Sequence, residues 1–147
     1  MRTKNITIAE VELTAFTLAR ELMTWDEPIP DFGTRFPNVL ESCLGMPFIR
    51  LSRKDMYRGL AGKASILFYL MVKNHPFQNG NKRIAIMTLF VFLFNNDKWL
   101  RIKESDLYNF AVGIAKSKPT SRGKTLLHIH KTIKQHLIDF PHDSKVE

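Results

Sequence analysis

The residues best suited to chemistry lie in one stretch, residues 75–83, which reads His-Pro-Phe-Gln-Asn-Gly-Asn-Lys-Arg. Histidine titrates near neutral pH, so His75 could accept a proton from an attacking hydroxyl group. Gly80 lets the backbone approach a ligand closely, and Lys82 and Arg83 add two positive charges. The stretch therefore predicts a site in which a general base acts beside an anion-binding group, as group transfer requires.

A helix boundary in the same stretch accounts for the anion-binding part. Pro76 disfavours the helical conformation in His75, which ends the preceding helical pattern. Asn81 directly precedes a long apolar run, so we predict that it is the N-cap of the next helix. Unpaired N–H groups and about half a positive charge make a helix N-terminus a ready anion site. A phosphate group would fit there.

The remaining sequence predicts a series of helices in one domain. Apolar residues at helical spacing predict helices over residues 7–24, 39–44, 55–73, 81–94, 105–115 and 125–138. Asp55 is a candidate N-cap, and residues 46–51 could be extended. The apolar run 84–94 predicts a central buried helix. With no repeat or linker visible, we expect a single all-α domain over residues 1–147.

Composition limits the location and the partners of the protein. The chain has 147 residues and a formal charge of +8, which favours acidic partners such as nucleotides, nucleic acid or an acidic protein. Its single cysteine, Cys43, cannot form an internal disulfide, so we expect a packed thiol in the reducing cytoplasm. The longest apolar run is shorter than the ~20 residues that a membrane-spanning helix needs. We therefore expect no membrane association.

The stretch at residues 75–83 resembles the motif of the Fic/Doc family, His-Pro-Phe-x-(Asp/Glu)-Gly-Asn-(Gly/Lys)-Arg. Upstream, residues 41–48 read Glu-Ser-Cys-Leu-Gly-Met-Pro-Phe and are similar to a segment of the Doc (death-on-curing) proteins. The likeness covers residues 37–115. It implies the all-α Fic/Doc fold, with the site at the loop that enters the central helix.

The resemblance also implies roles for single residues. His75 would deprotonate a hydroxyl of a target protein, which then attacks a phosphate of ATP. Gly80, Asn81, Lys82 and Arg83 would hold the phosphates, Arg83 as a bidentate partner. The family usually has Asp or Glu, a Mg²⁺ ligand, where this chain has Asn79. An asparagine carbonyl can bind Mg²⁺ but adds no charge, so we expect weaker metal binding.

Two positions indicate which branch of the family is nearer. Adenylyl-transferring Fic proteins usually have glycine where this chain has Lys82, and a second arginine where it has Ile86. Both choices match the Doc branch, in which the γ-phosphoryl group of ATP is transferred. The resemblance then implies phosphorylation of translation elongation factor Tu and growth arrest by a toxin. Adenylylation (AMPylation) of a protein hydroxyl is the near alternative.

The resemblance further implies an interaction segment and a regulator. Residues 46–51 lie where the family has a flap that docks the target. An internal inhibitory motif, (Ser/Thr)-x-x-x-Glu-(Gly/Asn), is matched only in part by residues 17–21, because Leu22 follows Glu21. Inhibition of the toxin would then come from a separate antitoxin. A basic toxin would attract an acidic antitoxin.

Two further functions stay open from the sequence. A catalytically weak member that only binds a nucleotide would explain Asn79. A helical ribonuclease toxin would use Arg122 and His128, whose spacing loosely resembles the Arg-x(4–6)-His signature of HEPN ribonucleases. The spacing is common by chance, and a solvated basic face accounts for the lysines around it. We therefore favour nucleotide and protein partners over nucleic acid.

Overall fold

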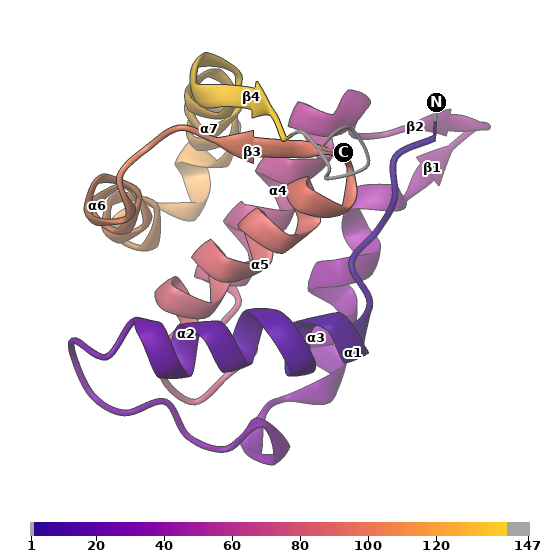
Figure 1. Ribbon diagram of the computed structural model, residues 1–147. Helices are drawn as coiled ribbons and strands as arrows, with labels where there is room; N and C mark the ends of the chain where they lie inside the picture. The colour runs from indigo at the N-terminus through magenta and orange to yellow at the C-terminus, as the bar shows by residue number, and fades with distance from the viewer. Residues whose placement is uncertain (1, 141–147) are drawn as a thin grey trace, which may run out of the picture.

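The structure, a computed structural model, describes residues 2–140 and is dominated by helices (Figure 1). The predicted domain spans 1–147, of which residues 1 and 141–147 lie outside the described part. A continuous helical rod comes first and consists of α1 (Ile8–Glu10), the π-helical η1 (Val11–Phe16) and α2 (Thr17–Leu22). The remaining helices are η2 (Phe32–Thr34), α3 (Pro37–Gly45), η3 (Met46–Phe48), α4 (Gly59–Lys73), α5 (Asn81–Asn95), α6 (Glu104–Lys116), η4 (Pro119–Ser121) and α7 (Arg122–His136).

Strands are few and short, so the fold is all-α as the sequence predicts. The strand β1 (Arg50–Leu51) pairs antiparallel with β2 (Lys54–Asp55) in a small hairpin. The strand β3 (Lys98–Leu100) pairs antiparallel with β4 (Leu137–Asp139), with Trp99 opposite Ile138. The second pair ties the segment after α5 to the end of α7, and neither pair contributes a sheet to the core.

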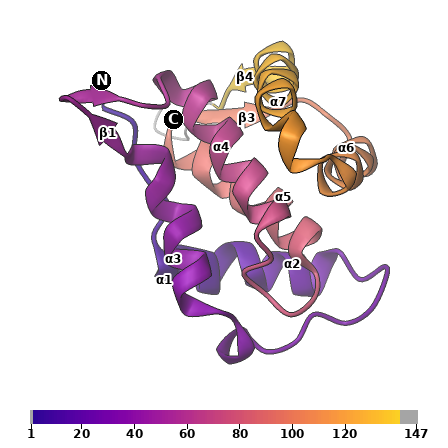
Figure 2. The ribbon, with the colours of Figure 1, turned by 180° about the vertical axis from the view of Figure 1, so that it is seen from behind.

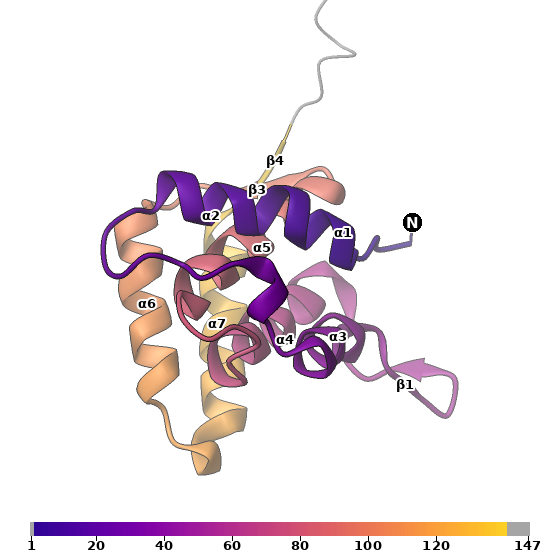
Figure 3. The same ribbon diagram turned by 90° about the horizontal axis from the view of Figure 1, so that it is seen from below.

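The helix α5 is the central helix of the fold. Its side chains from Arg83 to Phe90 are all buried, and so are Phe92 and Leu93. Such a helix can be stable in water only when other helices cover it on every side. Figure 3 shows the rod of α1, η1 and α2 crossing one side of α5, while α4 and α6 also pack against it. The prediction of a buried central helix is confirmed.

Two local predictions from the sequence are wrong. Asp55 does not cap α4: it lies in β2, and α4 begins after Arg58, whose backbone is extended. Residues 46–51 are only partly extended, because Met46–Phe48 forms a turn of 3-10 helix and the strand begins at Arg50. In both places a tight hairpin changes the local structure. Its residues Ser52 and Arg53 adopt positive φ angles, which no periodicity pattern reveals.

The lone cysteine is a packed apolar residue. Cys43 is fully buried in α3, and burial raises the pKa of its thiol to about 12. A thiol with this pKa is almost entirely protonated near neutral pH and is therefore a poor nucleophile. Within residues 2–140, no helix is both long and apolar enough to cross a membrane.

The proline-rich segment before α3 closes against the loop that joins α4 to α5. The Phe36 amide donates to the Pro76 carbonyl at 2.9 Å. The ring of Phe77 lies 5.6 Å from Phe16 and 5.8 Å from Phe32. Aromatic pairs at such distances add to the energy of burial, so this cluster fixes the loop to the rod and to η2. The fold thus holds the candidate site from two sides.

Candidate active site

The predicted motif begins just after the end of α4 and runs into the first turn of α5 (Figure 2). Phe77 is 3% exposed and anchors the loop from inside. His75 is exposed, and its φ angle is +52°. Positive φ angles are uncommon outside glycine and cluster at functional sites. The loop therefore presents the imidazole to solvent on a backbone held by buried neighbours.

Asn81 holds the loop rather than capping the helix. Its side-chain oxygen accepts from the Phe77 amide at 2.9 Å, and its amide nitrogen donates to the Phe77 carbonyl at 2.8 Å. The same nitrogen lies 3.4 Å from Nδ1 of His75, a long and weak contact. Asn81 is thus the first residue of α5, and the N-cap is Gly80, which has a left-handed conformation. The prediction that Asn81 is the N-cap is wrong by one residue.

This arrangement leaves the N-terminus of α5 open. The first intrahelical acceptor is the Gly80 carbonyl, which pairs with the Ile84 amide at 2.9 Å. The preceding amides of the first turn have no acceptor inside a helix, and no side chain caps them. Lys82 is half-buried beside them. Uncapped amides, the helix dipole and a nearby lysine are the features that an anion site at a helix N-terminus needs, and the predicted phosphate binding of Gly80, Asn81 and Lys82 stays a prediction.

Arg83 lies inside the protein, beneath the motif loop. It is 2% exposed, and its guanidinium donates to the carbonyl of Met23 at 3.0 Å and to that of Glu27 at 2.7 Å. Here it ties the segment after α2 to the first turn of α5. To pair with a phosphate it would have to release at least one carbonyl. The phosphate contact of Arg83 stays a prediction. Its hydrogen bonds to the carbonyls of Met23 and Glu27 are observed.

Met23 and Glu27 lie at the site, and no sequence pattern predicts them there. They act through backbone carbonyls, so their side-chain types carry no signal. Ile29 belongs with them, because it packs over Gly80: a Cβ built on the glycine would lie 2.6 Å from Cγ1 of Ile29. The segment from Met23 to Ile29 thus forms the floor under Gly80 and the first turn of α5.

Asn79 offers one oxygen to a metal ion. Its amide nitrogen points to the Pro28 carbonyl at 3.4 Å, so its side-chain oxygen is left for another partner. Mg²⁺ usually binds one or two protein oxygens together with water and substrate phosphates. In the described part of the chain, no group of three His, Cys, Asp or Glu side chains could hold a metal. Asn79 therefore fits Mg²⁺ only as a neutral ligand to an ion that the nucleotide carries.

Replacing Gly80 by alanine is expected to lower the free energy of unfolding by about 2 kcal/mol, because alanine is strained at φ +77° and would collide with Ile29. Denaturation in urea measures the change. Gly113 in α6 is the matched control, since a Cβ there has no atom within 4 Å. Gly113→Ala should stabilise the protein slightly, because alanine is the better helix former. Equal effects of the two substitutions would contradict the account of Gly80.

The other candidate segments lie apart from the motif. Residues 46–51 lie near the start of α4, while the motif follows its C-terminal end (Figure 2). The predicted target-docking role of residues 46–51 therefore stays a prediction. Of the two proposed ribonuclease residues, Arg122 stacks on Tyr69 with its guanidinium carbon 5.2 Å from the ring centre, and His128 packs against Phe110 at 5.2 Å. The two side chains pack against different rings.

The fold is an all-α domain whose central helix begins directly after the loop that carries His75 and Gly80. Comparison with family models gives a match to the Fic/DOC family over residues 13–93, more than half of the chain. The chain belongs to the Fic/DOC family. Comparisons with curated proteins and with solved structures gave no match. Domains of this family are commonly protein-modifying transferases.

Proposed function

We propose that the protein transfers the γ-phosphoryl group of ATP to a hydroxyl group of a protein target. The observation that carries the proposal is the open N-terminus of α5, with Lys82 beside it and the exposed His75 on the same loop. A helix end of this kind suits the phosphates of a nucleotide. An exposed imidazole suits a hydroxyl that arrives on another protein.

The proposed reaction is an in-line displacement at the γ-phosphorus. His75 takes the proton of the target hydroxyl while its oxygen forms a bond to phosphorus. The bond from the γ-phosphorus to the bridging oxygen breaks, and ADP leaves with that oxygen. The first-turn amides of α5 and the ammonium of Lys82 stabilise the negative charge on the phosphates, and positioning supplies much of the catalysis. When bound, Mg²⁺ would neutralise phosphate charge, with Asn79 as its one protein ligand.

The choice of phosphoryl transfer over adenylylation rests on Lys82 and Ile86. Ile86 is fully buried, so a second arginine of the adenylylating type is replaced by a core residue. Lys82 lies one helical turn before Ile86 and would place its positive charge beside the phosphates of the nucleotide. Adenylylation remains the second candidate, because the same open helix end could hold the α-phosphate.

Replacing Lys82 by glycine is expected to lower γ-phosphoryl transfer by about tenfold to a hundredfold, because the site loses an ammonium aimed at developing charge. Initial rates of transfer to a lysate measure the effect. Lys82→Met keeps the volume and removes only the charge, so it should be impaired as strongly. If Lys82→Met kept the full rate, the charge of Lys82 would have no part in the reaction.

Labelled ATP separates the two activities. The protein would be incubated with a bacterial lysate and Mg²⁺, and with ATP labelled at either the γ- or the α-phosphate. Label from the γ-position alone supports phosphoryl transfer. Label from the α-position means adenylylation in spite of Lys82. No transfer from either would favour a weak nucleotide-binding member, and a large gain of activity in Asn79→Asp would then confirm that Asn79 limits catalysis.

The biological part of the proposal is a toxin that acts in the cytoplasm on elongation factor Tu and is restrained by a separate antitoxin. It is supported by the net charge of +8, which suits an acidic partner, and by the incomplete inhibitory motif at residues 17–21. Expression of the chain alone should arrest growth, and His75→Ala should relieve the arrest. Growth arrest that persists in His75→Ala would point to the ribonuclease or another activity.

A further inference from the structure

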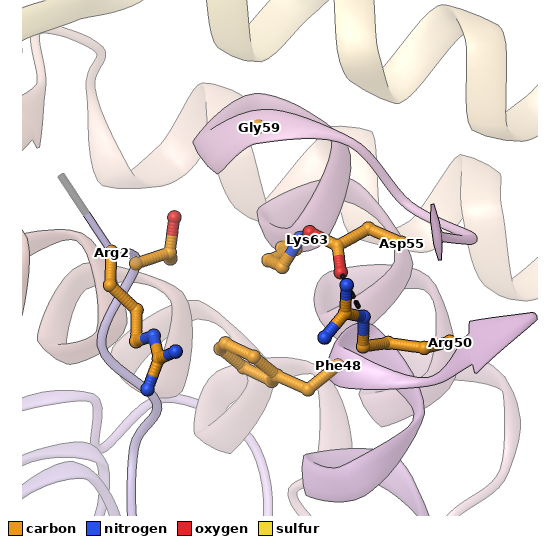
Figure 4. Close-up of a pocket in the computed structure, with 7 residues that line it drawn as sticks. Arg2, Phe48, Arg50, Asp55, Gly59 and Lys63 are labelled. Carbon is orange, nitrogen blue, oxygen red and sulfur yellow. Dashed lines mark hydrogen bonds and ion pairs between the residues drawn. The ribbon is translucent and has the colours of Figure 1, made fainter. Parts of the chain in front are cut away.

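A basic pocket lies at the start of α4, far from the motif. The helix has 15 residues, so its two ends are about 20 Å apart. The pocket has a volume of about 610 Å³, within the range of small-ligand sites. Figure 4 shows Arg2 on one side and the hairpin residues Arg50 and Asp55 on the other, with Phe48 and Lys63 between them. The pocket thus joins the N-terminal segment, the hairpin of β1 and β2, and the first turn of α4.

A buried ammonium group lies in the wall of this pocket. The side chain of Lys63 is 5% exposed, and Nζ donates to a carboxylate oxygen of Asp55 at 3.0 Å and to the Tyr57 carbonyl at 2.6 Å. The same nitrogen lies 5.6 Å from the centre of the Phe48 ring. Lysine is rarely so buried unless it is paired. Its contacts fix the position of the charge.

The pocket carries more positive than negative charge. Arg2, Arg50 and Lys63 line it, against the single carboxylate of Asp55. That carboxylate is already engaged by Lys63 and by Arg50, whose Nε lies 3.4 Å away. The hydrogen bond from Lys63 holds the pKa of Asp55 below its ordinary value, so the group stays ionised and paired. Three cationic side chains against one carboxylate leave the lining of the pocket with an excess of positive charge.

The backbone at the start of α4 leaves room for a ligand. Gly59 has a φ angle of +69°, and a Cβ placed on it would meet no atom within 4 Å. Arg58, the N-cap, makes no side-chain bond to the first turn of α4. The amide groups of this turn therefore lie beside the arginines without a side-chain cap, and they add to the same positive field.

We propose that this pocket binds a small phosphate-bearing ligand at a site separate from the candidate active site. Arginine forks match phosphate oxygens in geometry as well as in charge, and Arg2 and Arg50 line the pocket from opposite sides. Arg50, which also donates to the Arg53 carbonyl, would exchange that bond for one to the phosphate. The volume is larger than a phosphate group requires, and the ring of Phe48 offers an apolar face to the rest of the molecule. The inference does not depend on which group the active site transfers.

Amide chemical shifts can locate the binding directly. Pyrophosphate and AMP would be titrated, without Mg²⁺, into the ¹⁵N-labelled full chain while two sets of amides are followed. The first set is residues 50–63, around the pocket, and the second is residues 79–83, around the motif. We expect saturable shifts in the first set with both probes.

Two double variants test the assignment. Arg2→Ala with Arg50→Ala removes two charges from the pocket and is expected to weaken binding at least tenfold. Arg53→Ala with Lys54→Ala removes two charges from the same hairpin, at residues that do not line the pocket, and should leave the affinity within twofold. The single variant Arg2→Ala gives the same test if the first double variant is less stable, because it leaves the Lys63–Asp55 pair untouched.

Three results would overturn the proposal. Shifts confined to residues 79–83 would mean that phosphate binds at the motif alone. Equal weakening in both double variants would mean a diffuse charge effect of the hairpin. Tighter binding of a glutamate-rich tetrapeptide than of pyrophosphate would assign the pocket to acidic peptides instead.

Discussion

His75→Ala is expected to lower the rate of group transfer by about a hundredfold to ten-thousandfold, the range that a positioned general base contributes. The loop should keep its structure, because Phe77, Asn81 and Pro76 hold it through contacts that do not involve the imidazole. Since His75 is exposed, the free energy of unfolding should change by less than about 0.5 kcal/mol. The measurement is label transfer from ATP, together with urea denaturation of the same preparation.

Gln78 provides the matched control for His75. It lies on the same loop and is equally exposed, but it occupies a variable position of the motif. Gln78→Ala should keep transfer within about twofold of the original rate, as surface substitutions away from special contacts usually do. Full activity in His75→Ala would show that another group removes the proton, and the mechanism proposed above would be wrong.

Arg83→Ala is expected to lower the free energy of unfolding by about 3 kcal/mol. The substitution leaves the buried Met23 carbonyl and the partly buried Glu27 carbonyl without their donor, and each unpaired group costs about 1–3 kcal/mol. For a chain of this size, the change corresponds to a fall in Tm of about 6–12 °C. Calorimetry or a thermal melt measures it.

The adjacent residue separates the structural role of Arg83 from a role in binding. Lys82→Ala removes one positive charge from the same turn of α5, but from a half-buried side chain and not from the buried position that Arg83 occupies. Its stability should change by less than about 0.5 kcal/mol. If Arg83→Ala were as stable as the unmodified protein and lost only its transfer activity, the guanidinium would bind the phosphate and would not stabilise the loop.

Residue types and short spacings are enough to predict the helical class of the protein and the helix boundary at the motif. The run from Ile84 to Phe94 is apolar on every face, and such a run can only be the inside of a helical protein. Residues 75–83 combine a base, a glycine and two cations at a helix boundary. These features depend on residue types and short spacings, which is the information that a sequence states directly.

Helix ends and hairpins were predicted less well, because they depend on backbone conformations that several residue types can adopt. Asn81 was predicted as the N-cap from its type, yet the left-handed Gly80 is the cap, and the Asn81 side chain turns back to Phe77. Asp55 was likewise predicted as a cap, and it pairs instead with a lysine buried in the next helix. In both cases the side chain of a residue type that often caps helices makes its hydrogen bond to another group of the protein.

Only the tertiary structure decided what lies around the site. The segment from Met23 to Ile29 supports Arg83 and Gly80 from more than fifty positions away in the chain, through backbone carbonyls and one apolar side chain. The pocket at Gly59 and Lys63 gathers residues from three separate segments. No local pattern encodes such contacts, because long-range packing brings the groups together and the free energy of the whole fold fixes their distances.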